Sequence, residues 1–222
     1  MQAHTASQGT KFPVAFGART PSLGMPAGSA TMLTKGQELF AEGDEAECFY
    51  QVVSGAIRSY KLLSDGRRQI DAFHLAGDIF GLEAGRQHRF SAEAVGDARL
   101  VAYRRSRLSV LIEEDAGFRD RLLTATLRSL QRAQDHMLLL GRKTAQEKLA
   151  TFLLDMAERI SDDDEHFELP MQRSDIADHL GLTIETVSRT LTQFARSGLI
   201  RLLPAGRSIA LSNRMALKNL DT

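Results

Sequence analysis

Residues 182–194 read Leu-Thr-Ile-Glu-Thr-Val-Ser-Arg-Thr-Leu-Thr-Gln-Phe, and this stretch decides the fold of the C-terminal part of the chain. Apolar side chains recur with helical spacing on both sides of Gly181, at Ile176, Leu180, Leu182, Val187 and Leu191. Gly181 is expected to separate two short helices that bury a shared apolar face, and the small Ala177 suits the point where they cross. Thr183 is a good N-cap for the second helix. The pattern therefore predicts a helix-turn-helix.

Four side chains on the N-terminal half of the second predicted helix point outward and match the edges of DNA bases: Ile184, Glu185, Ser188 and Arg189. An arginine can donate two hydrogen bonds to guanine O6 and N7, a glutamate can accept one from cytosine N4, and serine and isoleucine suit thymine. Phosphate contacts are expected from Thr183, Thr186 and Arg173. The alternative is an ordinary turn in which Glu185 and Arg189 form an i,i+4 ion pair on a solvated helix face.

Residues 198–211 read Gly-Leu-Ile-Arg-Leu-Leu-Pro-Ala-Gly-Arg-Ser-Ile-Ala-Leu, which predicts two short strands around a turn at residues 204–206. Such a hairpin beside the second helix would complete a winged helix-turn-helix. Residues 172–222 hold seven basic and four acidic side chains, although the whole chain is balanced at 28 of each. A neutral chain with a local basic excess argues against a purely electrostatic nucleic-acid binder. The acidic run 155–168 is expected to be a solvated helix end and a loop.

The chain upstream of this segment is expected to form a mobile tail, a β-roll and a long helix. Residues 1–30 are rich in small and polar residues, as mobile tails are. Glycines recur at positions 43, 55, 66 and 77 between short Val, Ile, Phe and Tyr runs, and Ser64-Asp-Gly-Arg67 is typical of a hairpin turn. These features predict a β-roll over residues 31–105.

From Ser106 to Leu140 the apolar spacing becomes helical and leaves a narrow seam. The seam is expected to join two subunits through Leu123, Leu130, Ala133, Met137 and Leu140, although it could instead pack against its own β-roll. Residues 141–222 then form the winged helix-turn-helix domain. No apolar stretch is long enough to span a membrane and Cys48 is the only cysteine. We therefore expect a cytoplasmic, disulfide-free protein with no membrane partner.

The run Glu185-Thr-Val-Ser-Arg189 resembles the recognition helix of the CRP/FNR superfamily of bacterial transcription regulators, and within it the FixK-like branch. That branch carries Glu, Ser and Arg at this spacing, whereas the cyclic-AMP receptor branch has Arg before the Glu and Gly in place of the Ser. The resemblance implies an α+β fold with an N-terminal β-roll like a cyclic-nucleotide-binding jelly roll, a long dimerisation helix and a C-terminal winged helix-turn-helix. It also implies a homodimer that binds a palindrome like TTGAT-N4-ATCAA and recruits RNA polymerase, with targets in microaerobic or anaerobic respiration.

Four modes of regulation are open within this superfamily. Members that bind cyclic nucleotides cradle the phosphate with Gly-Glu and Arg-Ser/Thr pairs, and here Phe80-Gly-Leu-Glu83 and Arg89-Phe-Ser-Ala92 interrupt both. Iron-sulfur members need four cysteines, and this chain has only Cys48. Haem would need axial ligands such as His74 or His88. The fourth mode, implied by the resemblance to FixK-type regulators, uses no cofactor and depends on how much of the protein is made.

Two other classes of protein share parts of this pattern. Metal-dependent cupin enzymes also use a β-roll, but they need clustered histidine and carboxylate ligands. The six histidines of this chain are scattered, and no His-x-His motif occurs, so no catalytic or metal-binding residue is expected. A pure protein-interaction module would not need the outward Glu185, Ser188 and Arg189 ladder.

Overall fold

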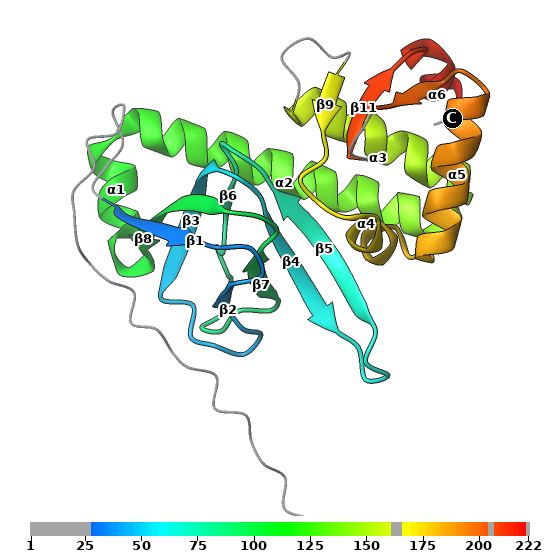
Figure 1. Cartoon of the computed structure of the whole chain (residues 1–222). Coiled ribbons are helices and arrows are strands. Elements are labelled where there is room, and N and C mark those ends of the chain that lie inside the picture. Colours follow the sequence, from blue (N-terminus) through cyan, green and yellow to red (C-terminus); the bar gives the residue numbers. More distant parts are fainter. Residues whose placement is uncertain (1–27, 161–165, 204–206, 221–222) are drawn as a thin grey trace, which may run out of the picture.

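The computed structural model describes residues 28–160, 166–203 and 207–220. Figure 1 shows an N-terminal β-roll and a C-terminal helical part that lie along one long helix, α2 (Ala116–Arg142). The predicted tail falls almost wholly on residues 1–27, and the predicted wing turn falls on residues 204–206. Residues 1–27 and 204–206 lie outside the described residues. The end of the predicted tail was wrong, because Ser29 and Ala30 pair with Ala102 and Val101 at the edge of a sheet. In the described part of the chain, no helix is long and apolar enough to cross a membrane.

Two four-stranded antiparallel sheets form the roll. One has the order β1 (Ser29–Leu33), β8 (Ala98–Arg104), β3 (Cys48–Ser54), β6 (Ile79–Phe80). The other has the order β2 (Glu38–Phe40), β7 (Ser91–Ala94), β4 (Ile57–Leu62), β5 (Arg68–His74). Buried and exposed residues alternate along β7 and through the first half of β8, as expected when one face of a strand packs against a core.

The glycines that recur in the sequence lie in the turns of the roll, as predicted. All four at positions 43, 55, 66 and 77 have positive φ. Gly55 joins β3 to β4 with φ 81°, and a Cβ atom there would lie 2.4 Å from the carbonyl oxygen of Asp97. Glycine is needed at this position both for its backbone conformation and for its lack of a side chain.

A single helix from Ser106 is not what the structure shows, and this expectation was wrong. A 3-10 turn (Arg105–Arg107) leads into a short α1 (Leu108–Glu114), and α2 begins only at Ala116. Asp115 is extended, and its carboxylate accepts a hydrogen bond of 2.8 Å from the backbone N–H of Phe118. This N-cap breaks the helical path and starts α2 in a new direction, so that Phe118 packs with Phe49 and Tyr103 of the roll.

The C-terminal part begins with α3 (Ala145–Ile160) and continues through β9 (His166–Glu168), α4 (Arg173–Leu180), α5 (Ile184–Arg196), β10 (Ile200–Leu202), β11 (Ser208–Leu211) and α6 (Arg214–Leu220). The two wing strands β10 and β11 are confirmed. The loop expected at the end of the acidic run 155–168 is wrong in part, because β9 pairs with β11 and buries Phe167 opposite Ile209.

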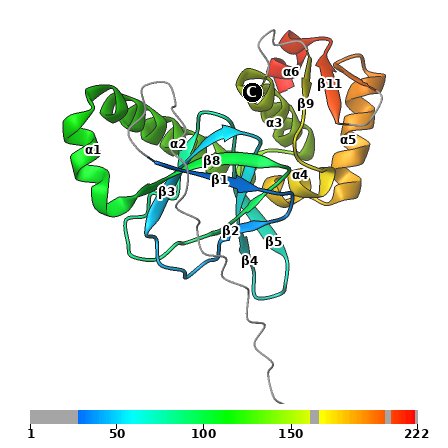
Figure 2. The same ribbon diagram turned by 60° about the vertical axis from the view of Figure 1, so that its left-hand side comes forward.

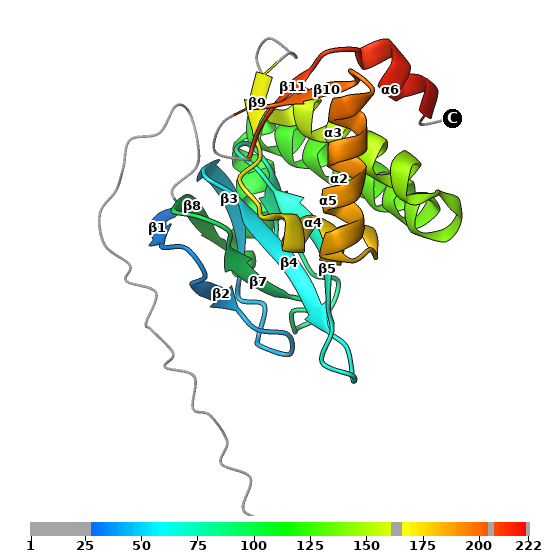
Figure 3. The same ribbon diagram turned by 45° about the vertical axis from the view of Figure 1, so that its right-hand side comes forward.

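One apolar cluster joins the two parts of the molecule. Ile70 and Phe73 of β5 pack into the same cluster as Phe152 of α3 and Ile176 of α4. Figures 2 and 3 show α4 beside β5 from two further directions. The helix-turn-helix is therefore seated against the roll.

Candidate nucleic-acid interface

The turn between α4 and α5 has the geometry that the sequence predicted. Gly181 ends α4 in the left-handed conformation, with φ 62° and ψ 42°. The backbone N–H of Leu182 donates to the carbonyl of Ala177 at 3.0 Å. Thr183 is the N-cap of α5, where its hydroxyl accepts a hydrogen bond of 3.2 Å from the N–H of Thr186. These local contacts set the angle between the two helices.

Apolar packing determines which face of α5 remains free. Val187 and Leu191 are buried in the cluster that contains Ala177 and Leu180 of α4. Phe194, which the sequence reasoning did not single out, is also buried there and continues the same helical spacing. The opposite face of α5 is left for solvent or for a partner.

The predicted base-contacting side chains lie together on that free face. Ile184, Glu185 and Arg189 are exposed, and Ser188 is half-buried. Hydrogen bonds from its own backbone N–H and from the Thr183 hydroxyl lower the pKa of the Glu185 carboxyl. The carboxylate is thus held ionised at the start of the helix, as an acceptor for a base amino group.

The ordinary-turn alternative requires an ion pair between Glu185 and Arg189. Both residues are described, and the structure shows no salt bridge between them. Their charges interact only at a distance, as a minor contribution to the lowered pKa of Glu185. Both charged groups therefore remain available to an external partner.

The predicted phosphate-contacting residues flank this face. Thr183 is exposed at the helix start, and its hydroxyl lies 3.1 Å from that of Thr186. Arg173 stands in the first turn of α4 and donates to the Ser188 hydroxyl at 3.3 Å. Arg173 thereby links the first helix to the exposed face of the second.

The face extends farther along α5 than the sequence reasoning proposed. A surface hollow is lined by Ser188, Arg189, Thr192, Gln193 and Arg196. Three of these residues were missed: Thr192, Gln193 and Arg196. Their spacing of three, four and seven from Arg189 places them on its side of the helix, which is the signal that could have identified them.

An apolar stripe runs along the solvent side of α2. Of the residues predicted at a subunit contact, Leu123, Leu130, Ala133 and Met137 are exposed in the single chain. Leu140 differs, because it is partly buried against the C-terminal core of its own chain. Leu127 and Leu138, which were not predicted, are exposed beside the stripe.

The segments that resemble a phosphate cradle are engaged in other contacts. The Glu83 carboxylate accepts a hydrogen bond from the backbone N–H of Arg89 at 3.3 Å, and the Arg89 guanidinium lies over the ring of Phe90. The Ser91 hydroxyl accepts from the backbone N–H of Glu42 at 2.9 Å. Each of these three residues thus has a contact of its own within the roll.

Stacked rings occupy the interior of the roll. Phe40 stacks on Tyr50 and on His88, with ring centroids 5.7 and 3.6 Å apart. His74 stacks on Phe80 at 4.4 Å, and its Nε2 lies 3.1 Å from the Ser59 hydroxyl. The two histidines considered as haem ligands are therefore held within the packing of the roll.

Two features of the described residues concern metal and redox chemistry. No group of three His, Cys, Asp or Glu side chains there is placed to hold a metal ion. Cys48 is buried, and burial raises the pKa of its thiol. A thiol in this environment is a poor nucleophile, as expected for a packing residue.

Comparison with known proteins gives a consistent result. Residues 147–220 match a family described as Crp-like helix-turn-helix domain, and residues 31–115 match one described as cyclic nucleotide-binding domain. The nitrogen fixation regulation protein FixK of Azorhizobium caulinodans is 48% identical over 205 residues, covering 90% of this chain and 81% of that protein. The fumarate and nitrate reduction regulatory protein of Escherichia coli is 36% identical over 193 residues, covering 85% and 76%. The solved structure of FixK2 from Bradyrhizobium japonicum matches with a TM-score of 0.82 and 49% identity, covering 89% of this chain and 98% of that one.

Proposed function

This chain belongs to the CRP/FNR family and is a DNA-binding transcription regulator of the FixK/FNR type, and from that premise we propose that it binds, as a homodimer, a palindrome like TTGAT-N4-ATCAA. The observation that carries the proposal is the free face of α5. There Glu185, Ser188 and Arg189 stand exposed or half-exposed on the N-terminal half of the helix, the half that enters the major groove in helix-turn-helix proteins.

Each residue on this face has a distinct role in the proposed complex. Arg189 donates two hydrogen bonds to the guanine of the half-site, and Glu185 accepts from N4 of the cytosine paired with that guanine. Ser188 and Ile184 contact thymine. Thr183 and Thr186, together with Arg173, hold the phosphate backbone and fix the register of the helix in the groove.

Dimerisation follows from the apolar stripe on α2. The side chain of Leu130 is 54% exposed, and Leu123 and Met137 are more exposed still. Large apolar residues at heptad spacing on one side of a long helix are stable when the same helix of a second subunit covers them. A dimer about that axis presents two recognition helices to two half-sites one helical turn apart.

The proposed activity needs no bound effector. The family includes cyclic-nucleotide receptors, but here Glu83 accepts a hydrogen bond from the backbone of Arg89, and Ser91 accepts one from the backbone of Glu42. The Arg89 guanidinium lies over the ring of Phe90. The bound dimer then activates transcription by recruiting RNA polymerase, and the cell controls it through the amount made.

Selection of bound DNA from a random pool, in air and without added ligand, tests this function. An inverted repeat of TTGAT with a four-base spacer is the expected product. Recovery of a different motif would refute the base assignments to α5. Recovery of the motif only after cyclic AMP is added would refute the effector-free mode and leave the DNA-binding function intact.

A further inference from the structure

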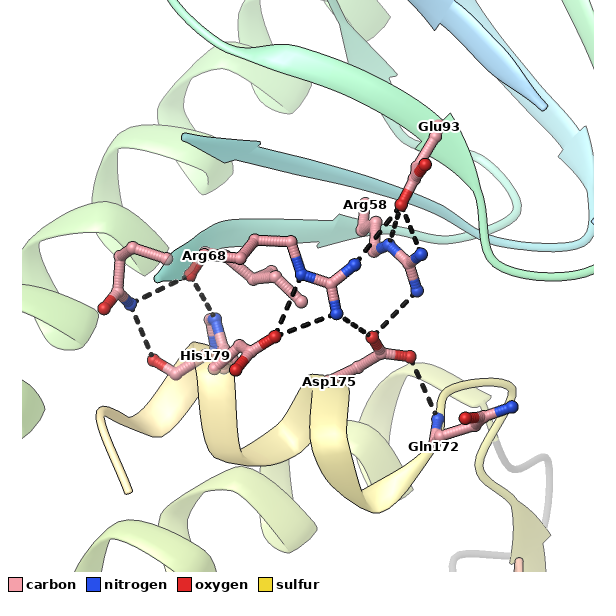
Figure 4. A network of polar contacts seen from close by, with 9 residues as sticks. Arg58, Arg68, Glu93, Gln172, Asp175 and His179 are labelled. Carbon is pink, nitrogen blue, oxygen red and sulfur yellow. Dashed lines mark hydrogen bonds and ion pairs between the residues drawn. The ribbon is translucent and has the colours of Figure 1, made fainter. Parts of the chain in front are cut away.

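The hairpin formed by β4 and β5 is joined to α4 by a cluster of ion pairs, shown in Figure 4. The Arg58 guanidinium donates to Asp175 at 2.8 Å, and the Arg68 guanidinium donates to the same carboxylate oxygen at 2.6 Å. Arg68 also donates through Nε to Asp178 at 2.9 Å. Two arginines of the roll thus hold two carboxylates of the first helix of the helix-turn-helix. We call these four residues the dock.

The dock is largely shielded from water. Only 4% of the Asp175 side chain is exposed, compared with 14% for Arg58 and 24% for Arg68. Glu93 of β7 balances the arginines from the other side by accepting hydrogen bonds from both. Charge-assisted hydrogen bonds in such surroundings are short and directional, so they restrict how α4 can turn relative to the roll.

Further contacts hold both ends of α4. At the N-terminal end, the second oxygen of Asp175 accepts the N–H of Gln172 at 3.2 Å, so the same carboxylate caps α4 and docks it. At the C-terminal end, the Nδ1 of His179 lies 3.1 Å from the carbonyl oxygen of Ile70 in β5. The side-chain amide of Gln69 donates to the His179 carbonyl at 3.3 Å. The helix is therefore held along its whole length.

The orientation of α4 determines the direction of the recognition helix, because α4 and α5 share a buried apolar face. Docking of α4 leaves Glu185 and Arg189 exposed. We infer that Arg58 and Arg68 are positioning residues for DNA binding: they fix the angle of α5 relative to the roll and the dimer helix, and so set the spacer length that the dimer accepts. This inference rests on the proposed palindromic function.

The physical reason is that a dimer binds a palindrome well only when both recognition helices enter the major groove together. If α4 is held rigidly, a spacer of the wrong length forces one helix out of register. If the dock is broken, the helix-turn-helix can change its orientation and bind palindromes with other spacers. Affinity for the correct spacer then falls, because the domain must be ordered on binding.

The substitution Arg68→Gln tests the inference with little risk to folding, since Arg58 still neutralises the buried Asp175. Full-length protein is titrated against TTGAT palindromes with spacers of three, four, five and six base pairs at one salt concentration. We expect the wild type to prefer the four-base spacer. We expect the variant to lose roughly tenfold of that preference, equal to about 1.4 kcal/mol, while its discrimination against a base change within one half-site stays unchanged.

Arg67→Gln is the matched control, because Arg67 is the neighbouring residue of the same hairpin. Its side chain is 77% exposed and pairs with Asp65 rather than with α4. Its spacer preference should equal that of the wild type. Asp178→Asn weakens the dock from the other side, and adding it to Arg68→Gln should change little beyond Arg68→Gln alone, because that variant has already lost the contact with Asp178.

Three results would distinguish a failure of this inference from a failure of the proposed function. A wild-type spacer preference in both Arg68→Gln and Asp178→Asn overturns the inference. Tighter binding by these variants also overturns it, since the dock would then hold a non-binding arrangement. Failure of the wild type to bind any TTGAT palindrome overturns the proposed function itself, whatever the variants do.

Discussion

Replacement of Arg189 by alanine is the most direct test of base reading. The guanidinium is exposed, and no hydrogen bond or ion pair to another described residue holds it. Binding to DNA therefore breaks no internal contact of Arg189, and its removal should change the folded protein little. A bidentate arginine–guanine pair contributes about 1–3 kcal/mol of discrimination, which is roughly 5-fold to 140-fold in affinity. A homodimer carries two such pairs, so Arg189→Ala should lose about 2–6 kcal/mol on a full palindrome, since well-separated positions are roughly additive.

The assay compares wild type, Arg189→Ala and Arg189→Lys on two DNAs at fixed salt, because salt alone shifts every affinity. One DNA is the TTGAT palindrome, and in the other an A·T pair replaces the G·C pair of each half-site. The alanine variant should discriminate between them much less than the wild type, because only the contact of Glu185 with the cytosine remains. Lysine keeps the charge but not the planar fork, so it should recover only part of the discrimination. If Arg189→Ala weakens both DNAs alike and discriminates between them as strongly as the wild type does, Arg189 contacts phosphate and the base assignment is wrong.

Three further outcomes follow from the packing. Leu130→Glu should yield monomers in sedimentation, whereas Gln131→Glu, an equal charge change beside the stripe, should leave the dimer intact. Burial lowers the pKa of His74 to about 4 and that of His179 to about 3. Unfolded histidine titrates near 6.5, so the unfolded chain binds more protons than the folded chain below that pH. The free energy of unfolding should therefore fall by about 1 kcal/mol per histidine for each pH unit below 6.5. Urea unfolding at pH 7.5 and at pH 5.5 measures this difference. Phe167→Ala should lower the free energy of unfolding by about 3–5 kcal/mol, because β9 buries this ring.

Each of these outcomes can fail in an informative way. A dimeric Leu130→Glu variant would place the subunit contact away from the stripe. Equal stability at the two pH values would mean that the buried histidines gain protons without unfolding. A loss below about 1 kcal/mol for Phe167→Ala, the size of an average substitution, would mean that β9 contributes little to the domain.

Features that depend on a few neighbouring residues could be predicted from the sequence. Gly181 and Thr183 indicate the helix-turn-helix from the sequence. A left-handed residue that ends one helix and an N-cap that starts the next each act within one turn of their own helix. The turn glycines of the roll are local in the same sense. The break before α2 is also local, but the apolar spacing continues across Asp115 and hides it. An N-cap residue inside a continuing apolar pattern can therefore mark the start of a new helix.

Contacts between distant segments could not be predicted in this way. β9 holds one buried residue, Phe167, in an acidic run, and its strand character comes from pairing with β11 about forty residues later. The dock joins Arg58 to Asp175, which are 117 residues apart. Neither residue has a sequence neighbour that signals its partner, since ion pairs across an interface depend on the completed fold. The hollow on α5 shows the intermediate case, in which helical spacing was available and was followed only to Arg189.

The dock also limits how an effector could regulate this protein. A switch that turned the helix-turn-helix away from the roll would separate Asp175 from both of its arginines, and breaking a buried ion pair costs about 3–5 kcal/mol. A ligand can supply such energy only through a difference in its affinity for the two states, and a change from mostly off to mostly on needs about 5.5 kcal/mol. In the roll, Glu83 accepts a hydrogen bond from the backbone of Arg89, Ser91 accepts one from the backbone of Glu42, and stacked rings occupy the interior. A ligand in the roll would have to break these contacts and still supply that energy. We therefore expect the docked arrangement, which is competent to bind DNA, to be the resting state. The roll would then serve to hold α4 and so to fix the orientation of α5.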